Sequence, residues 1–426
     1  MNRTKMLALL AGAAMSAGVA NAQTANNSAL ERELLADAGA RASFQAGGSA
    51  GHDGQFFIGD ASGNNRLEIG GYMQFRYTLN NRDTTSPDED LTNGFDMTRT
   101  ALEFGGNVVN PNLGYYIRGY FDTYGGSSNG GFELADAYGT YTFDSGMTVI
   151  WGQMIAPVIR ERMVDDRYQL AADRSITNDV FSPEYVQGIA FAYAAENWKV
   201  VGSFNDGAGT ANTAYYSPAE ADYALTGRVE FKWSGDWAQF DDFTSWRGTE
   251  GYAGMVGGAV HWQTAGDTAN TTSFAGGTLA GGDLILYTAD VSIEGNGWNA
   301  FGAFIGRTID PDGATSSTDD FGAVVQGGVF VTDNWELFGR WDGIFPDDDS
   351  TSGDDYHTIT FGANHYFFPG SHAAKFTADV QIALENQSGA SAVSGFSVPD
   401  QSTGLLPTAG TDDNQWMLRL QMQLVF

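Results

Sequence analysis

The residues of this sequence with the clearest capacity for chemistry are arginines gathered in one long segment, residues 155–186. Four of the seventeen arginines of the chain lie there. Arg160, Arg167 and Arg174 recur at every seventh position, which predicts a single stripe along a helix. Four of the six acidic residues of the segment, mostly off that stripe, offset the positive charges. The candidate residues of this segment are Arg160, Arg162, Arg167, Arg174, Glu161, Asp165, Asp166 and Asp173.

A segment of this kind can act on charged solutes. A guanidinium stays charged and offers a planar fork that matches a phosphate or a carboxylate. Folded into a wide channel, the segment would narrow it and impose a local field. The alternative is an exposed loop whose internal ion pairs contribute a few tenths of a kcal/mol each. The sign of any selectivity also stays open, because the formal net charge of −31 favours cations at a channel mouth.

Other kinds of chemistry are not indicated. The absence of Cys excludes disulfides, thiolate zinc sites and a cysteine nucleophile. The five His residues show no metal-ligand spacing, and no nucleotide-binding or nucleophile motif is present, so we expect neither an enzyme nor a cofactor. An enzyme would become plausible only if His261 or His365 lay beside an inward Ser and a carboxylate. The acidic tips at residues 347–349 and 354–355 are read as solvated charge, with calcium binding as the alternative.

The composition points to a β protein. The 426 residues include 56 Gly and 13% aromatic residues, a mixture typical of turn-rich strands. The acidic balance excludes a nucleic-acid partner, whose binding protein would be basic.

The N-terminal region predicts export. Residues 1–22 read as a signal peptide, with Arg3 and Lys5 before an apolar core and Ala20-Asn21-Ala22 at the cleavage site. No later stretch reaches the roughly 18 apolar residues of a transmembrane helix. Residues 23–54 are expected to form a periplasmic segment with a short helix at 28–38. Residues 55–58 and 66–69 could make a hairpin, and residues 55–426 would form the membrane domain.

From residue 67 onward, apolar and polar residues alternate with the period of a β-strand. Sixteen such segments of roughly 9–13 residues follow one another, near the length of a tilted membrane strand. They are expected to begin near Leu67, Met97, Leu113, Phe132, Gly146, Gln187, Asn197, Asp222, Tyr252, Asp283, Gly297, Phe321, Asn334, His357, Ala373 and Gln415. Short turns and long loops alternate between them. This pattern predicts an all-β fold, a 16-stranded antiparallel transmembrane β-barrel with an infolded third loop. One connector, residues 233–251, is too long for its turn position, so it is either a structured loop or a sign of a miscounted hairpin.

The same alternation predicts which charged residues face the lumen. A charge facing lipid at the midplane costs about 2–4 kcal/mol, so charged residues belong to the inner face. Trp198, Trp298 and Trp335 each follow a short turn, where an aromatic girdle would meet the membrane interface. The alternative is aromatic packing at the strand ends of a soluble sheet. The expected pore-wall residues are Arg76, Arg99, Arg118, Glu103 and Asp136, and Glu68 shares their face.

Three stretches resemble the phosphate-selective porin O and P family of outer-membrane porins. Residues 151–157 (Trp-Gly-Gln-Met-Ile-Ala-Pro), continued by Glu161 and Asp173-Arg174-Ser175, are similar to that family's strand leading into its third loop. Residues 70–76 resemble its first strand and residues 415–426 its last. The resemblance implies a sixteen-stranded barrel, a homotrimer and passive diffusion of small hydrophilic solutes. It also implies that the C-terminal Phe426 is read by the barrel-assembly machinery.

Together these observations predict an outer-membrane porin of a Gram-negative-type bacterium, surrounded by lipid and lipopolysaccharide. The solutes would be small hydrophilic molecules or ions, with anions such as phosphate as the sharper hypothesis. The alternative is a secreted soluble β-rich adhesin or sugar-binding protein, which would dissolve without detergent.

Overall fold

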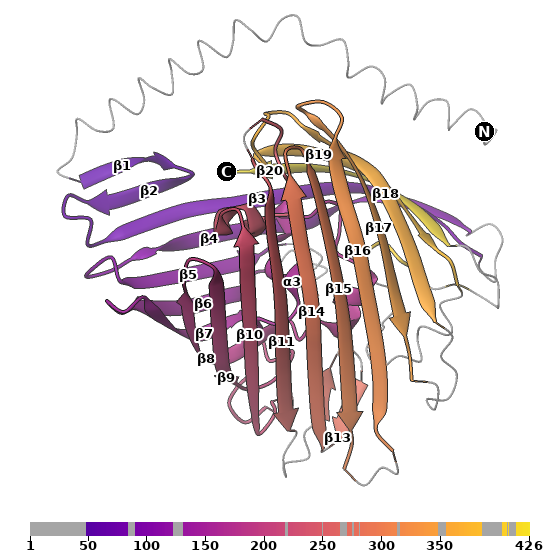
Figure 1. Ribbon diagram of the computed structural model, residues 1–426, viewed down its shortest axis with the longest axis horizontal. Helices are drawn as coiled ribbons and strands as arrows, with labels where there is room; N and C mark the ends of the chain where they lie inside the picture. Colours follow the sequence, from indigo (N-terminus) through magenta and orange to yellow (C-terminus); the bar gives the residue numbers. More distant parts are fainter. Residues whose placement is uncertain are drawn as a thin grey trace, which may run out of the picture.

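The computed structural model of this chain is a closed antiparallel β-barrel (Figure 1). It describes residues 48–83, 90–121, 131–217, 220–248, 250–264, 271–274, 277–280, 282–312, 316–347, 355–385, 403–406, 408 and 415–426. The barrel strands are β3 (Arg66–Asn81), β4 (Leu91–Asn107), β5 (Leu113–Tyr120), β6 (Glu133–Thr142), β7 (Met147–Ile155), β8 (Tyr185–Ala194), β9 (Trp198–Asn205), β10 (Tyr223–Ser234), β11 (Ala253–Thr264), β14 (Asp283–Gly295), β15 (Trp298–Asp310), β16 (Thr318–Phe330), β17 (Trp335–Phe345), β18 (Tyr356–Tyr366), β19 (Ala374–Ala383) and β20 (Trp416–Val425). Each pairs with its neighbour in the chain, and β20 pairs with β3 to close the sheet. The predicted sixteen-stranded barrel is confirmed.

The two faces of the wall follow the alternation of the sequence. In β10, exposed and buried residues alternate along the strand: Val229 and Phe231 point outward, while Arg228 and Glu230 point inward. An outer face of this kind matches hydrocarbon, and an inner face that carries the charges can hold water. Trp198, Trp298 and Trp335 start β9, β15 and β17 with 44%, 39% and 40% of their surface exposed, as the girdle prediction requires.

The strand starts lie close to their predicted positions, with one larger difference. β4 begins at Leu91 rather than near Met97. Residues 91–96 contain Asn, Gly and Asp and resemble a loop in composition, but they pair with the far end of β3, from Asn81↔Leu91 to Arg76↔Asp96. Pairing with a long neighbouring strand therefore overrides the weak local preference.

A small hairpin extends the sheet beyond the barrel. β1 (Gly48–Asp53) pairs with β2 (Gln55–Asp60), and β2 pairs with the first residues of β3. The hairpin predicted between β2 and the start of β3 is confirmed, and β1 adds a strand from within the predicted periplasmic segment. Figure 1 shows β1 and β2 beside the C terminus. The predicted signal peptide and the helix at residues 28–38 lie outside the described residues.

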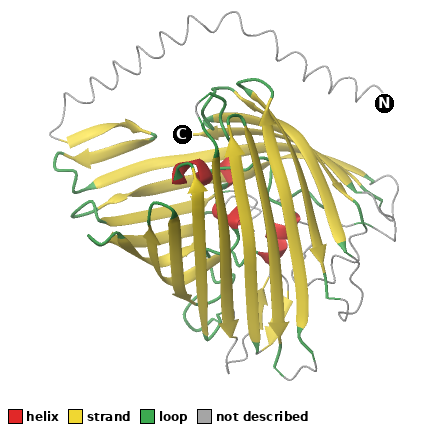
Figure 2. Ribbon diagram, viewed as in Figure 1, coloured by secondary structure: helices red, strands yellow, loops and turns green. Residues whose placement is uncertain are grey.

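The remaining elements lie in the connectors. β12 (Thr271–Phe274) and β13 (Gly277–Ala280) form a separate hairpin in the loop between β11 and β14. The described helices are short: α3 (Arg160–Met163), η3 (Asp166–Tyr168), α4 (Ile176–Phe181) and η4 (Trp237–Asp241). None of these described helices is long and apolar enough to cross a bilayer. Figure 2 shows helices, in red, within the curve of the yellow wall.

Residues 235–252, between β10 and β11, decide between the two interpretations of the long connector. They contain η4, and the strand count on both sides is as predicted. The connector is therefore a structured turn and not a miscounted hairpin. We refer to the end of the barrel with short connectors as the turn end and to the opposite end as the loop end.

Candidate pore constriction

The third long connector, residues 156–184, folds back into the barrel, and we call it the L3 segment. The strand before it is shaped by Gly152, whose φ is 126° and at which a Cβ would lie 2.2 Å from the carbonyl oxygen of Ala137. Only glycine fits there. Next to it, Gln153 donates to the carbonyl oxygens of Leu134 and Ala135 at 3.0 and 2.6 Å and accepts from the backbone N–H of Asn212 at 2.7 Å. Gly152 and Gln153 thus fix the point at which L3 leaves the wall.

The L3 segment is not one helix, so the predicted arginine stripe is wrong. Arg160 lies in α3 and Arg167 in η3, while Arg174 lies in an irregular stretch before α4. The breaks have a local cause. The side chains of Asp165 and Ser175 accept hydrogen bonds from the backbone N–H groups of Arg167 and Asn178, respectively, so each begins a new turn. The four arginines therefore point to different neighbours.

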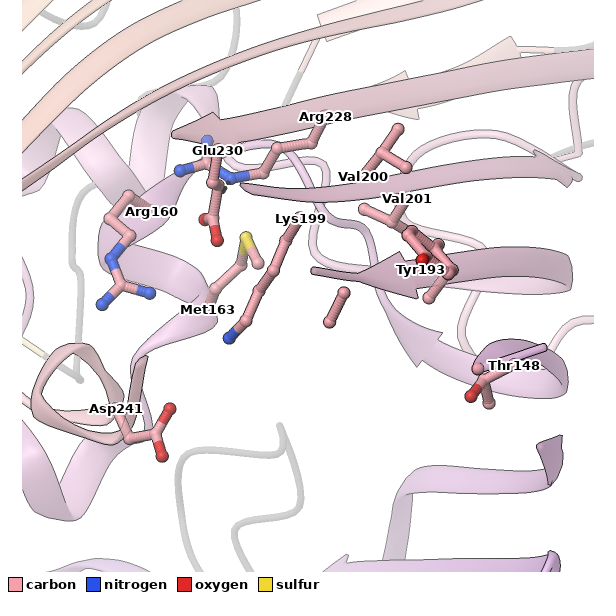
Figure 3. Close-up of a pocket in the computed structure, with 13 residues that line it drawn as sticks. Thr148, Arg160, Met163, Tyr193, Lys199, Val200, Val201, Arg228, Glu230 and Asp241 are labelled. Carbon is pink, nitrogen blue, oxygen red and sulfur yellow. Dashed lines mark hydrogen bonds and ion pairs between the residues drawn. The ribbon is translucent and has the colours of Figure 1, made fainter. Parts of the chain in front are cut away.

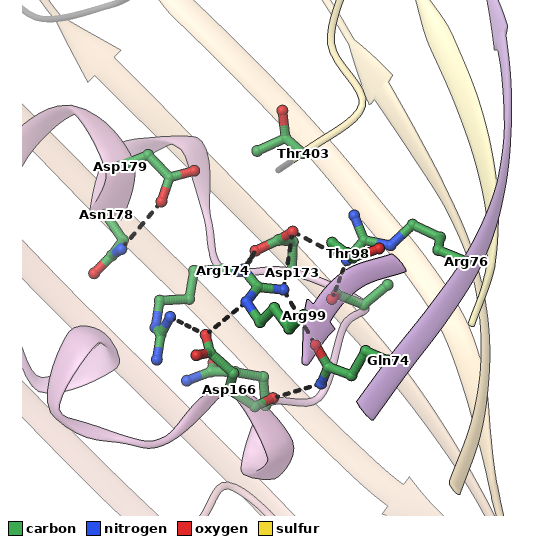
Figure 4. A network of polar contacts seen from close by, with 12 residues as sticks. Gln74, Arg76, Thr98, Arg99, Asp166, Asp173, Arg174, Asn178, Asp179 and Thr403 are labelled. Atoms are coloured by element: carbon green, nitrogen blue, oxygen red, sulfur yellow. Dashed lines mark hydrogen bonds and ion pairs between the residues drawn. The ribbon is translucent and has the colours of Figure 1, made fainter. Parts of the chain in front are cut away.

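The acidic residues of L3 bind arginines of the wall (Figure 4). Asp173 contacts Arg76 of β3 at 3.1 Å and Arg99 of β4 at 2.8 Å. Arg99 also contacts Asp166 at 3.3 Å, and Asp166 pairs with Arg174. All five side chains are buried. Burial opposes ionisation of Asp173, but Arg99 and Arg76 outweigh it and lower its pKa.

A second ion-pair cluster joins η3 to β4, β5 and β6. Arg118 contacts Asp165 at 2.6 Å, Glu103 at 2.9 Å and Asp136 at 3.8 Å. Arg167 contacts the same Glu103 at 2.6 Å and the same Asp165 at 3.0 Å. Burial raises the pKa of Asp165, but the charges of Arg118 and Arg167 outweigh this and lower it overall. The structure thus places the predicted wall residues and most of the predicted constriction residues in mutual contact inside the barrel rather than in an open ring.

The far half of L3 docks by apolar contacts. Ile176, Val180 and Phe181 of α4 belong to one buried cluster with inward-facing residues of the wall. Leu286 and Ile344 are among those wall residues, and both are fully buried. Burying one such side chain contributes about 1.5–3 kcal/mol. The wall beneath α4 is therefore covered by packed apolar side chains.

Sequence reasoning missed several lumen residues. The partner of Arg162 is Glu184, at 2.7 Å, which lies in the same segment but was not singled out. Wall residues in the second half of the chain were missed as well, although their alternation with outward Val229 or Leu337 marks them equally clearly. Three of their ion pairs are Arg228–Asp290 (2.8 Å), Arg307–Asp320 (2.6 Å) and Arg419–Asp379 (2.7 Å).

A cavity of about 340 Å³ lies between α3 and the wall strands β7 to β10 (Figure 3). Its charged lining residues are Arg160, Lys199, Arg228, Glu230 and Asp241. Arg228 is paired with Glu230 at 2.8 Å. Arg160 differs from the other three arginines of L3. It forms no ion pair with a described carboxylate, donates to the carbonyl oxygen of Phe240, and its Nε has no partner among the described residues.

Sites for metal or acid–base chemistry were also sought in the described part of the chain. No group of three or more His, Asp or Glu residues there could hold a metal ion. His261 is buried against Thr226 and Gln263 at 2.8 and 3.0 Å, not beside a Ser and a carboxylate. Most of the acidic tips named above lie outside the described residues.

A closed barrel with an apolar outer face and an infolded, charged segment defines an outer-membrane channel. The sequence pattern of the family described as phosphate-selective porin O and P matches residues 69–395, and the chain belongs to this family. The predicted family is therefore confirmed. The members of this class are channels and not enzymes, and the secreted adhesin is excluded. No protein of curated function matches the sequence.

Solved structures with the same fold include other outer-membrane proteins. The anion-selective porin from Comamonas acidovorans is 11% identical, with a TM-score of 0.56 over 85% of this chain and 100% of that one. The outer-membrane channel DcaP of Acinetobacter baumannii is 12% identical, with a TM-score of 0.54 over 85% and 98%. The trimer form of OmpT of Vibrio cholerae is 12% identical, with a TM-score of 0.52 over 85% and 99%. Identities this low establish the fold alone.

Proposed function

We propose that this protein is a passive diffusion channel for small hydrophilic solutes, narrowed by L3 and weakly selective for anions. One observation carries the proposal: Arg160 lines the open cavity and, unlike Arg162, Arg167 and Arg174, forms no ion pair with a described carboxylate. The constriction consists of the L3 residues predicted from the sequence and the wall residues that hold them.

Charge pairing decides which arginines a permeating ion senses. A guanidinium beside a carboxylate presents a dipole, whose field falls off faster than that of a single charge. A single charge about 4 Å from an ion contributes about 1 kcal/mol in water and about 4 kcal/mol at an effective dielectric constant near 20. About 1.4 kcal/mol is a tenfold preference. Arg160 and Lys199, opposed by Asp241 on the same cavity, leave a net positive charge that is sufficient to set a weak preference.

The acidic excess of the chain favours cations and so opposes the anion preference set by Arg160. Exposed charges more than about 10 Å from the ion path are largely screened at 0.1 M salt. Acidic loops therefore influence the entry of cations mainly at low ionic strength, whereas Arg160 acts at the narrow part in any salt. We expect the anion preference to strengthen as the salt concentration rises.

The test is the reversal potential of the reconstituted protein in a KCl gradient. Arg160→Gln should shift the reversal potential toward cation selectivity, and Arg160→Lys, which keeps the charge, should not. The matched control is the double variant Arg162→Gln/Glu184→Gln, which removes a neighbouring pair without changing net charge and should leave the potential unchanged. An unchanged potential in Arg160→Gln would refute the assignment.

Phosphate is the sharper candidate solute, because Arg160 and Lys199 offer two cationic donors to an anion on a cavity whose acidic lining residues are Asp241 and the Arg228-paired Glu230. Adding phosphate to a KCl solution should then reduce the current, and Arg160→Gln should relieve that block. If phosphate does not reduce the current, the channel passes small anions in general and does not favour phosphate.

We propose that the channel assembles as a homotrimer in the outer membrane, with lipid and lipopolysaccharide around it. The trimer form of the similarly folded OmpT supports this arrangement. The C-terminal Phe426, 57% exposed at the end of the closing strand, is accessible to the assembly machinery that the family resemblance implies.

A further inference from the structure

The long turn between β10 and β11 folds into the barrel instead of out of it. Its residues Phe240, Phe243, Thr244, Ser245 and Trp246 are all buried, with at most 9% of each exposed. A turn that merely joined two strands at the membrane surface would leave such side chains in water. We call residues 236–248 the plug.

The plug reaches the L3 segment from the turn end. The backbone N–H of Phe243 donates to the carbonyl oxygen of Tyr168 at 3.3 Å, and Arg160 donates to the carbonyl oxygen of Phe240. The Phe243 ring packs in one cluster with Val164 and other L3 residues. The two infolded segments are therefore in direct contact inside the lumen.

The plug is also anchored to the wall on the far side. The Trp246 ring lies 4.7 Å from that of Tyr366 and 5.2 Å from that of His372, between ring centroids. Asp242 contacts the Nε2 of His372 at 3.0 Å, and Thr244 contacts the Tyr366 hydroxyl at 3.3 Å. These partners belong to β18 and the turn after it, several strands away from β10 and β11.

On its near side the plug is held by β9 and the turn before it. The Trp237 indole donates to the carbonyl oxygen of Ala195 at 3.0 Å, and the Lys199 ammonium lies 4.4 Å from the centroid of the Trp237 ring. Asp241, at the end of η4, lines the open cavity together with Arg160 and Lys199. The plug thus borders the cavity on one side and fills the lumen toward β18 on the other.

We propose that the plug is a second constriction that determines size and charge selectivity. It blocks the turn end of the lumen on the side of β14 to β19 and leaves the cavity beside Arg160 and Lys199 as the route for solutes. This inference rests on the proposed function, because the plug can set size and charge selectivity only in a channel that conducts.

The direct test removes the plug. Residues 235–252 are replaced by Asn-Gly, the pair that already forms the tight turn between β14 and β15 at Asn296-Gly297 and that favours two-residue hairpins. Single-channel conductance should rise severalfold, and the effect of Arg160→Gln on the reversal potential should disappear in the plug-less background. Unchanged conductance would overturn the inference. A wild type that does not conduct at all would instead refute the proposed function.

A second measurement keeps the inference testable if the plug-less variant fails to fold. The chain contains no Cys, so an introduced thiol reports on one position only. Ser245→Cys replaces a fully buried plug residue, and Asp333→Cys places a thiol on an exposed turn at the same end of the barrel. A charged thiol reagent should modify Asp333→Cys many times faster than Ser245→Cys, and adding Trp246→Ala should remove that protection. Equal rates in the two single variants would overturn the inference.

Discussion

At the scale of single residues, L3 is held by carboxylates that each serve two arginines. Asp173 bridges Arg76 and Arg99, and Asp165 bridges Arg118 and Arg167. Removing charges from water is costly, and the mutual attraction of a buried pair offsets that cost only when the partners are well placed. The main effect of these buried pairs is therefore to fix the position of L3 in the lumen. Their contribution to the free energy of unfolding is smaller.

Replacing Asp173 by Asn should be strongly destabilising, because two buried guanidinium groups lose a shared carboxylate. Breaking a buried pair from one side costs about 3–5 kcal/mol. Urea unfolding of the reconstituted protein measures this loss. The control is Asp144→Asn, at an exposed turn residue, for which we expect a change within about 0.5 kcal/mol. A loss of similar size in both variants would contradict the bridging role of Asp173.

The alternation of apolar and polar residues along the strands was sufficient to predict the wall residues. Arg76, Arg99 and Arg118 could be placed in the lumen because lipid does not accept their charge. Their partners could not be predicted, because the contact between Asp173 and Arg76 depends on how a loop crosses the barrel. The seven-residue spacing of the L3 arginines was misleading because L3 is not one helix. The side chains of Asp165 and Ser175 cap new helical turns, and the chain changes direction at each of them.

At the scale of elements, L3 is attached in two ways, by ion pairs near β3 to β6 and by apolar contacts of α4 near β14 to β17. The two attachments contain different titratable groups. The first depends on several carboxylate–arginine pairs, whereas the second has one carboxylate contact, from Asp342 of β17 to the backbone N–H groups of Ile176 and Thr177 at 3.2 and 3.4 Å. Acidification therefore tests mainly the first attachment.

L3 should stay docked as the pH falls from 7 to about 4.5. The pKa values of Asp165, Asp166 and Asp173 are lowered by neighbouring arginines, which outweigh burial. A lowered carboxyl pKa gives stability that is present above the ordinary value of 3.8 and is lost only as the pH falls through the lower, folded value. Hydrogen-exchange protection of residues 160–181, corrected for intrinsic rates, measures the docking.

Glu161 is the exception, because burial raises the pKa of its carboxyl group despite Arg340 and the hydrogen bonds from Ser175. It therefore protonates before Asp165, Asp166 and Asp173 on acidification. Glu161→Gln, which resembles the protonated form in shape, provides the control for the hydrogen-exchange measurement. If L3 loses its hydrogen-exchange protection above pH 4.5, and loses it in Glu161→Gln as well, then Asp165, Asp166 and Asp173 do not hold L3 in place.

The sequence contained a sign of the plug that strand counting alone did not use. Trp237, Phe240, Phe243 and Trp246 recur at every third position in a turn that should face water. An exposed turn would leave these four aromatic side chains in water, so their spacing indicates an apolar partner. The length of the connector predicted a structured turn, but its direction depended on Tyr366 and His372, which lie far along the chain.

At the scale of the whole molecule, closure of the barrel joins its first strand, β3, to its last, β20. Phe426 and Gly71 exchange two backbone hydrogen bonds of 2.9 Å. The β1–β2 hairpin continues the sheet from the same end of β3. The C-terminal residue therefore contributes to closure, in addition to the recognition role implied by the family resemblance.

Deleting Phe426 should reduce assembly in the outer membrane severalfold. Wild-type membranes, run unheated on a denaturing gel, should show an oligomer of trimer size that dissociates on boiling. The deletion should lose most of this species, whereas Phe426→Tyr should retain it. Normal amounts of oligomer in the deletion variant would refute the assembly role, and a wild-type band of monomer size would refute the trimer.

The central claim is that Arg160, beside the cavity left open by L3 and the plug, sets the selectivity of the channel. The most direct test is the reversal potential in a KCl gradient, measured side by side for the wild type and Arg160→Gln. We predict a weakly anion-selective wild type and a shift toward cations in the variant. A cation-selective wild type whose reversal potential is unchanged by Arg160→Gln would contradict the claim and assign control of selectivity to the acidic mouth.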